Sequence, residues 1–273
     1  HVELSPLENY TLTGSVFKNT DGSGLKGAKV VITSENVTFE YTTAADGSFV
    51  ATGIFGGTYD VYAGAWGYKH TFIDNLEVNA NNALSLGLDE GYQDDFILDF
   101  EWTTTASNPG GTGFWVRGEP VGTTFQGSLS NPDFDVEGDL GDLCYVTGNG
   151  GGGAGNDDVD DGIVTLTSPV MDLSGYSNAT LSYRLWFFNN GGNGGPPNDA
   201  LTVTVSNGTE EVELENVTFS VGAWRPTSTH ILGDVITLTD NMTVSFQTSD
   251  LQASGHLVEA AVDQFLVEGS VTY

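Results

Sequence analysis

The segment from Ala179 to Val205 (ATLSYRLWFFNNGGNGGPPNDALTVTV) constrains the fold of this chain more than any other stretch. Apolar and polar residues alternate on both sides of a loop rich in glycine, proline and asparagine, and this period of two is typical of half-buried β-strands. The loop itself offers no apolar side chains for a core. Oxygen-rich loops of this kind suit a calcium ion or a polar ligand, so Asn189 and Asn190 are candidate ligand-binding residues. The segment favours a binding module over a catalyst.

The charge balance narrows the possible partners. The chain has 37 Asp and Glu residues against 7 Lys and Arg residues, which gives a formal net charge of -30. Nucleic acid and anionic membrane surfaces require basic patches, so we expect no nucleic-acid partner. No apolar run approaches the ~20 residues of a membrane span, so we expect no membrane insertion. Divalent cations fit the composition, although a solvated acidic surface accounts for most of these carboxylates.

The N-terminal third reads as an antiparallel β-sandwich over residues 11–89, preceded by an extended leader at residues 1–10. Short strands are separated by turn residues such as Asp46-Gly47, a spacing typical of sandwiches. The stretches LTGSVFKNTDGSGLKGAKVVIT and TTAADGSFVATGIFGGTYDVYAGAWGY resemble the carboxypeptidase regulatory-like domain, a transthyretin-like sandwich. The resemblance implies an accessory β-module that has no catalytic residues.

The remainder, residues 93–273, reads as a second antiparallel sandwich of jelly-roll type. No segment carries helical periodicity. The predicted strands are 96–100, 113–116, 143–146, 163–167, 179–188, 201–205, 211–217, 235–238, 242–248 and 258–267.

A second resemblance covers most of this part. The stretches FWVRGEPVGT, CYVTGNGGGGAGNDDVDDG, LTSPVMDLSGY and VEAAVDQF resemble jelly-roll modules of secreted bacterial peptidases and adhesins. The resemblance implies a module that sits downstream of a peptidase domain and is related to adhesion and carbohydrate-binding jelly rolls. Other domains of a longer parent chain are therefore expected.

Two groups of acidic residues are candidate calcium sites. The first group combines the acidic run at residues 156–161, which glycines flank, with the two polar residues that precede the predicted strand 201–205. The run fails the EF-hand pattern because Asp161 stands where that motif needs glycine, so a calcium loop at the sandwich rim competes with a solvated turn. The residues of this group are Asn156, Asp157, Asp158, Asp160, Asp161, Asn198 and Asp199.

The second group joins the first and last strands of the predicted jelly roll, which pair in many such folds. Asp94, Asp95 and Asp263 are its candidate ligands, and caps or turn acceptors are the competing interpretation. Glu259 belongs to an H-x-x-E sequence that begins at His256, but the zinc motif also needs a His further along the chain, and none follows in the 14 remaining residues. Zinc catalysis is therefore rejected, and Glu259 is a candidate calcium ligand or hydrogen-bond acceptor.

Trp186 is a candidate stacking residue for a sugar ring, with a core position as the competing interpretation, since aromatic residues of all-β domains usually fill the core. No catalytic motif of the serine-hydrolase or zinc-protease type occurs in the chain. The sequence thus predicts an all-β chain of two tandem sandwiches. Its function is predicted as a non-catalytic accessory region of a secreted multidomain bacterial protein, an extracellular peptidase, stabilised by calcium. One alternative is a carbohydrate-binding or adhesion module with a glycan or protein partner at the cell surface. The other is a structural subunit of an extracellular filament or surface layer, in which the extended segment His1–Leu4 would complement the sheet of a neighbouring copy.

Overall fold

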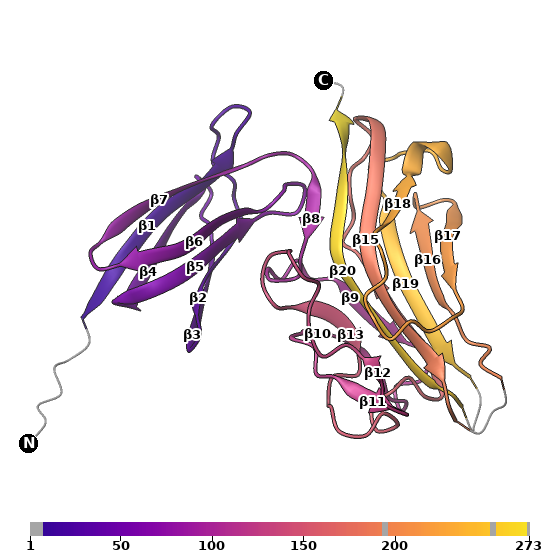
Figure 1. The fold of residues 1–273 in the computed structure, drawn as a ribbon. Coiled ribbons are helices and arrows are strands. Elements are labelled where there is room, and N and C mark those ends of the chain that lie inside the picture. Colours follow the sequence, from indigo (N-terminus) through magenta and orange to yellow (C-terminus); the bar gives the residue numbers. More distant parts are fainter. Residues whose placement is uncertain (1–7, 193–195, 252–254, 272–273) are drawn as a thin grey trace, which may run out of the picture. The chain divides into compact units, whose positions relative to one another are not determined.

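The computed structural model describes residues 8–192, 196–251 and 255–271 and divides into two compact units, one ending at Gln93 and the other beginning at Asp94 (Figure 1). The predicted all-β class is confirmed: the described residues form strands and a single 3-10 turn, η1 (Leu232–Asp234). None of the described helices could traverse a bilayer. Most of the predicted leader, including the segment His1–Leu4 behind the filament alternative, lies outside the described residues. The first strand already begins at Asn9.

The first unit is a sandwich of two sheets. One sheet has the order β4-β1-β7 and the other has the order β3-β2-β5-β6. All of these pairs are antiparallel except β1 with β7, which is parallel. Apolar residues from both sheets form one core cluster, and Tyr59 belongs to it as a buried side chain. The strands are β1 (Asn9–Lys18), β2 (Lys29–Ser34), β3 (Val37–Thr42), β4 (Ser48–Phe55), β5 (Gly57–Gly64), β6 (Thr71–Val78) and β7 (Asn82–Leu88).

The second unit also has two large sheets, with the orders β10-β13-β20-β15-β18 and β17-β16-β19-β14-β9, and a separate hairpin of β11 with β12. The strands that follow β8 (Tyr92–Asp94) are β9 (Thr103–Ala106), β10 (Trp115–Gly118), β11 (Thr123–Phe125), β12 (Ser128–Asn131), β13 (Cys144–Thr147), β14 (Gly162–Thr167), β15 (Tyr176–Asn190), β16 (Leu201–Ser206), β17 (Glu211–Val217), β18 (Ser228–Ile231), β19 (Thr243–Asp250) and β20 (Leu257–Val271).

Two long antiparallel strands, β15 and β20, run side by side through the middle of one sheet (Figure 1). Buried and partly exposed residues alternate from Ala179 to Leu185 of β15, as expected for a strand that is buried on one face. By contrast, Val258–Asp263 of β20 are buried without a break, so this stretch is covered on both faces. The pairing register shifts between Ser182 and Arg184, opposite Asp263 and its neighbours on β20. Such a bulge adds a residue to one strand and turns a side chain out of its regular position.

Candidate metal centre and ligand pocket

Three carboxylates meet beside the central strand of the second unit. Asp263 lies on β20, and Asp135 and Asp139 lie in the segment that connects β12 to β13. One oxygen of each side chain lies within 4.8 Å of an oxygen of each of the other two. Among the described residues, no other group of three or more His, Cys, Asp or Glu side chains brings its ligand atoms so close together.

Backbone geometry and packing place these side chains. Gln264 has a φ of 51°, and its amide donates a hydrogen bond of 2.7 Å to Asp263 Oδ1. The connecting segment is held to the sheet because Val136 is buried in a core cluster that includes Trp224. The Trp224 indole also donates a hydrogen bond of 2.9 Å to the carbonyl of Phe134. The cluster therefore lies between a strand and a loop that are each fixed by their own contacts.

Four of the six carboxylate oxygens of this cluster lack a hydrogen-bond donor among the described residues. Both oxygens of Asp135, Oδ2 of Asp139 and Oδ2 of Asp263 are buried and accept no hydrogen bond from the described part of the chain. Asp263 is 0% exposed. The ion pairs found in the described residues of this unit involve other carboxylates. A buried carboxylate that is neither paired nor hydrogen-bonded is costly, so the cluster needs protons or a cation.

The same conclusion follows from the pKa values. Burial, together with the neighbouring Asp135 carboxylate, raises the pKa of Asp139 to about 7. Burial and the proximity of Asp135 and Asp139 raise the pKa of Asp263 well above its ordinary value, and burial also raises the pKa of Asp135. The buried Asp95 adds to the negative charge that acts on Asp139.

A hard divalent cation fits this donor set. Calcium binds six to eight oxygen ligands at about 2.3–2.6 Å, and carboxylates are its main protein ligands. Three carboxylates that converge from a strand and a loop, with Asp263 Oδ2 buried and without a donor, provide such oxygens. Soft-metal coordination is not supported by this set, because it contains no thiolate or imidazole.

The predicted second group of ligands is found only in part. Asp263 belongs to the cluster, and Asp95 is buried near it. Asp94 has a different role, because its Oδ1 accepts the Phe96 amide at 2.9 Å and its Oδ2 accepts the Trp102 indole at 2.8 Å. Asp94 is thus a buried turn acceptor, which is the competing interpretation of that residue.

The predicted first group is not assembled into one carboxylate cluster within the described ranges. Asp158 is buried, and burial together with Asp160 raises its pKa to about 7. Asp157 accepts the amide of Gly150 through Oδ2 at 2.7 Å, and Asp161 occupies a left-handed turn with a φ of 57°. Asn156 is exposed at the start of the loop. A calcium site in this loop stays a prediction.

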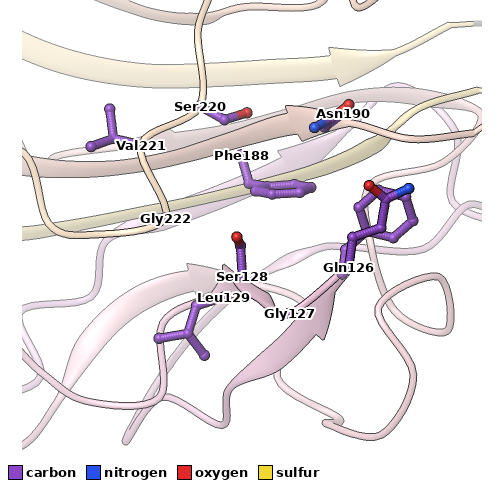
Figure 2. Close-up of a pocket in the computed structure, with 10 residues that line it drawn as sticks. Gln126, Gly127, Ser128, Leu129, Phe188, Asn190, Ser220, Val221 and Gly222 are labelled. Atoms are coloured by element: carbon purple, nitrogen blue, oxygen red, sulfur yellow. The ribbon is translucent and has the colours of Figure 1, made fainter.

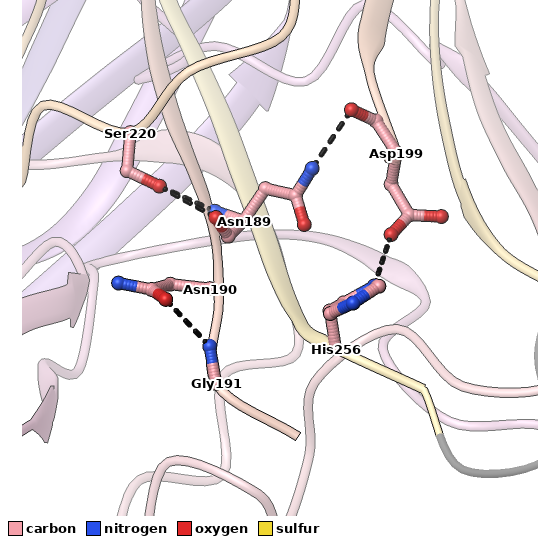
Figure 3. Close-up of polar contacts among 6 residues, drawn as sticks. All are labelled: Asn189, Asn190, Gly191, Asp199, Ser220 and His256. Carbon is pink, nitrogen blue, oxygen red and sulfur yellow. Dashed lines mark hydrogen bonds and ion pairs between the residues drawn. The ribbon is translucent and has the colours of Figure 1, made fainter. Parts of the chain in front are cut away.

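The other predicted ligands are exposed or are engaged in other contacts. Asn198 is exposed, whereas Asp199 is buried and pairs through Oδ2 with Nδ1 of His256 at 2.9 Å (Figure 3). Glu259 is also buried and accepts the Thr147 hydroxyl at 3.0 Å. Burial raises the pKa of Glu259 well above its ordinary value.

Asp135 and Asp139 were not predicted as site residues. The signal was present as the spaced acidic residues of the stretch DFDVEGDLGD, from Asp133 to Asp142. This stretch has no strand pattern, so nothing in the sequence related it to β20, more than 100 residues further along the chain.

A pocket of about 560 Å³ opens between the β11–β12 hairpin, the end of β15 and the segment around Ser220 (Figure 2). Asn190 lines it, and its role as a ligand-binding residue stays a prediction. Its neighbour Asn189 does not line the pocket, because Asn189 is buried and its side-chain NH2 group donates a hydrogen bond of 2.8 Å to the Asp199 carbonyl (Figure 3). The Ser220 hydroxyl is bonded to both backbone groups of Asn189, at 2.7 and 3.0 Å. These bonds of Asn189 therefore fix the end of β15, which carries Asn190.

Trp186 corrects the expectation of an exposed stacking ring. Its side chain is 0% exposed, and its indole donates a hydrogen bond of 2.7 Å to the carbonyl of Ser130. The competing interpretation, a core position, holds here because the ring packs edge-on against Trp224.

Comparison with known proteins supports the first resemblance. Residues 11–89 match the family model of the carboxypeptidase regulatory-like domain. The first unit has this domain's predicted β-sandwich architecture. No curated protein matches the chain.

Solved structures resemble the chain at low identity. The K1 cleaved adhesin domain of Lys-gingipain from Porphyromonas gingivalis is 16% identical over 66% of this chain and 98% of that domain, with a TM-score of 0.43. The K3 adhesin domain of the same protein is 13% identical over 65% and 98%, with a TM-score of 0.36. The family 11 carbohydrate-binding module of a cellulase from Clostridium thermocellum is 11% identical over 67% and 96%, with a TM-score of 0.37. Similarity at this level does not assign a ligand.

Proposed function

We propose that this chain is a non-catalytic binding region of a secreted multidomain bacterial protein, and that calcium stabilises its second unit. The observation that carries the proposal is the buried cluster of Asp135, Asp139 and Asp263. A cation there would neutralise the three carboxylates and fasten the β12–β13 segment to β20. It would also reduce the self-repulsion of a chain whose net charge is -30.

The accessory role is supported by the regulatory-like domain at residues 11–89. Since this family takes its name from carboxypeptidases, we propose that the parent protein is an extracellular peptidase. The purified chain is expected to show no peptidase or esterase turnover. Turnover that a single carboxylate substitution abolishes would contradict the non-catalytic assignment.

The calcium proposal is tested by thermal unfolding of metal-depleted protein with and without calcium. At about 100 times the dissociation constant, calcium adds about 2.7 kcal/mol to the free energy of unfolding, which corresponds to about 5–10 °C in the melting temperature of a unit of this size. Magnesium should replace calcium poorly because it gives up its water ligands reluctantly.

Two variants locate the effect. Asp263→Asn keeps the shape of the side chain and removes a ligand charge, so its melting temperature should no longer respond to calcium. Glu137→Gln removes a charge from an exposed position of the same segment and should respond as the unchanged protein does. An equal calcium response in Asp263→Asn would place the cation elsewhere, and no response in the unchanged protein would remove calcium from this function.

A further inference from the structure

We propose that the pocket between the β11–β12 hairpin and the end of β15 binds a neutral carbohydrate. This inference deepens the proposed binding function by naming the chemical class of its ligand. The pocket belongs entirely to the second unit, and its volume of about 560 Å³ falls within the range of about 300–1,000 Å³ that is typical of small-molecule sites.

The pocket has no ionisable side chain. Its ten lining residues include no Asp, Glu, Lys, Arg or His, although the whole chain carries 37 acidic residues. A charged ligand would therefore meet no opposite charge in the pocket, and an anion would also be repelled by the field of the chain. The lining selects for a ligand without formal charge.

The polar side chains of the pocket can both donate and accept hydrogen bonds. Gln126, Ser128 and Asn190 are exposed, and each carries an amide or a hydroxyl group. Asn190 uses its carbonyl oxygen for the amide of Gly191 at 2.8 Å, which orients its NH2 group. Figure 2 shows Asn190 and Gln126 at the same side of the pocket. Sugar hydroxyls, which also donate and accept, match this set.

Apolar surface lies beside these groups. The ring of Phe125 meets the ring of Phe188 edge-on, with 6.3 Å between the ring centroids. Gly191 approaches the Phe125 ring so closely that an added Cβ would lie 2.8 Å from Cζ, so the backbone supports this ring. Val221, at 48% exposure, adds aliphatic surface. A sugar ring presents C–H groups as well as hydroxyls and can use both kinds of surface.

The site is built on a rigid hairpin. Gln126 and Gly127 form the two-residue connection between β11 and β12, and their φ angles are 50° and 83°. Positive φ at both positions is typical of a type I′ turn, which matches the twist of the flanking strands. The Ser220–Asn189 hydrogen bonds fix the opposite wall. Little ordering is therefore needed when a ligand binds, which favours affinity.

The test uses the full chain, saturated with calcium, on an array of neutral oligosaccharides, uronic-acid oligosaccharides and short peptides. The strongest binder is then measured by titration calorimetry. We expect a neutral oligosaccharide to bind, and both Asn190→Ala and Gln126→Ala to weaken it about 5–20-fold, because each removes hydrogen bonds to the ligand. Asn178→Ala, at an exposed asparagine near the other end of β15, is the matched control and should bind normally.

Circular dichroism and the melting temperature verify that each variant is folded. The proposal is overturned if no neutral oligosaccharide binds, if charged oligosaccharides or peptides bind instead, or if the folded pocket variants bind as tightly as the control. Loss of the calcium response with intact sugar binding would contradict the calcium proposal alone. A calcium response without sugar binding would contradict the pocket assignment alone.

Discussion

The carboxyl group of Asp139 connects the charge of one residue to the stability of the molecule. In the absence of metal its pKa is about 7, against an ordinary value of 3.8. Between these two pH values the folded chain therefore binds more protons at this site than the unfolded chain does. The contribution of this group to the free energy of unfolding is greatest below the pKa of the unfolded chain and is lost as the pH rises through the pKa of the folded chain.

Calcium must displace that proton, so its effect depends on pH in the opposite sense. We expect the increase in melting temperature caused by calcium to be largest above about pH 7 and to shrink as the pH falls to about 5. The measurement is the melting temperature of metal-depleted and calcium-loaded protein across this range. Asp139→Asn should weaken the pH dependence, since Asp135 and Asp263 also titrate above their ordinary range, whereas Glu137→Gln should keep it in full. An increment that grows as the pH falls would contradict the assignment of these carboxylates as ligands.

At the scale of single residues, the sequence identified one of the three clustered carboxylates. Asp263 was predicted because it lies on the last strand, which pairs with the first strand in many jelly rolls. Asp135 and Asp139 lie in a segment without periodicity, and only the folded sheet brings them to β20. The Asp46–Gly47 turn was predicted correctly, since Gly47 has a φ of 79° and Asp46 accepts the Ser48 amide at 3.0 Å.

At the scale of the element, the β11–β12 hairpin has a turn residue that does not suit its geometry. Gln126 adopts a φ of 50°, where asparagine is much more common than glutamine. Gln126→Asn should therefore stabilise the chain by a few tenths of a kcal/mol, up to about 1 kcal/mol, and Gln126→Ile should destabilise it by about 1 kcal/mol or more.

Urea unfolding of the two variants measures this difference. Gln247 is an exposed residue of β19, and Gln247→Ile is the control because a β-branched residue suits an ordinary strand. If Gln126→Ile proved as stable as Gln126→Asn, the turn could not be of the type described here.

Alternation of apolar residues predicted the long strands well, from β14 through β17 and again in β19 and β20. Elsewhere this pattern predicted strands that do not form and missed strands that do. The segment 96–100 buries every second residue, yet it forms bends, because Phe96 has a φ of 56° and its amide is held by Asp94. The segment 235–238 follows η1 and is also not a strand. Alternating apolar residues indicate that every second side chain is buried, and a segment of bends can bury its side chains in the same way.

The unpredicted strands of the second unit are short and polar. Those that the sequence did not indicate are β9, β11, β12 and β18, each of three or four residues rich in threonine and serine. β9 and β18 pair with strands that lie far away in the sequence, β14 and β15 respectively, whereas β11 and β12 pair with each other. Threonine favours strands, but three or four mostly polar residues are too short to show an alternation of apolar residues, so the sequence pattern does not indicate these strands.

At the scale of the whole molecule, the two units are expected to unfold separately. Each of them has its own hydrophobic core cluster. Scanning calorimetry should therefore resolve two transitions, of which calcium raises only the one that belongs to the second unit. A single transition that calcium shifts as a whole would show that the units unfold cooperatively.

A variant of the first unit identifies the other transition. The buried Thr43 hydroxyl oxygen accepts the Ala28 amide at 2.9 Å and donates to the Leu25 carbonyl. Thr43→Val leaves the amide without its acceptor and should cost about 1–3 kcal/mol. The temperature of the calcium-independent transition should fall in this variant. Thr42→Val, at an exposed position of β3, should change that temperature little.

The position of β20 in its sheet has a mechanical consequence. This strand pairs with β13 on one side, and on the other side it pairs with β15 along most of its length. Ladder hydrogen bonds of antiparallel strands lie perpendicular to the chain. Tension applied along β20 would load many of these bonds in shear at once, instead of opening them one by one. A cation at Asp263 would add a cross-link in the middle of the strand under load, so the second unit would resist pulling best where calcium is plentiful.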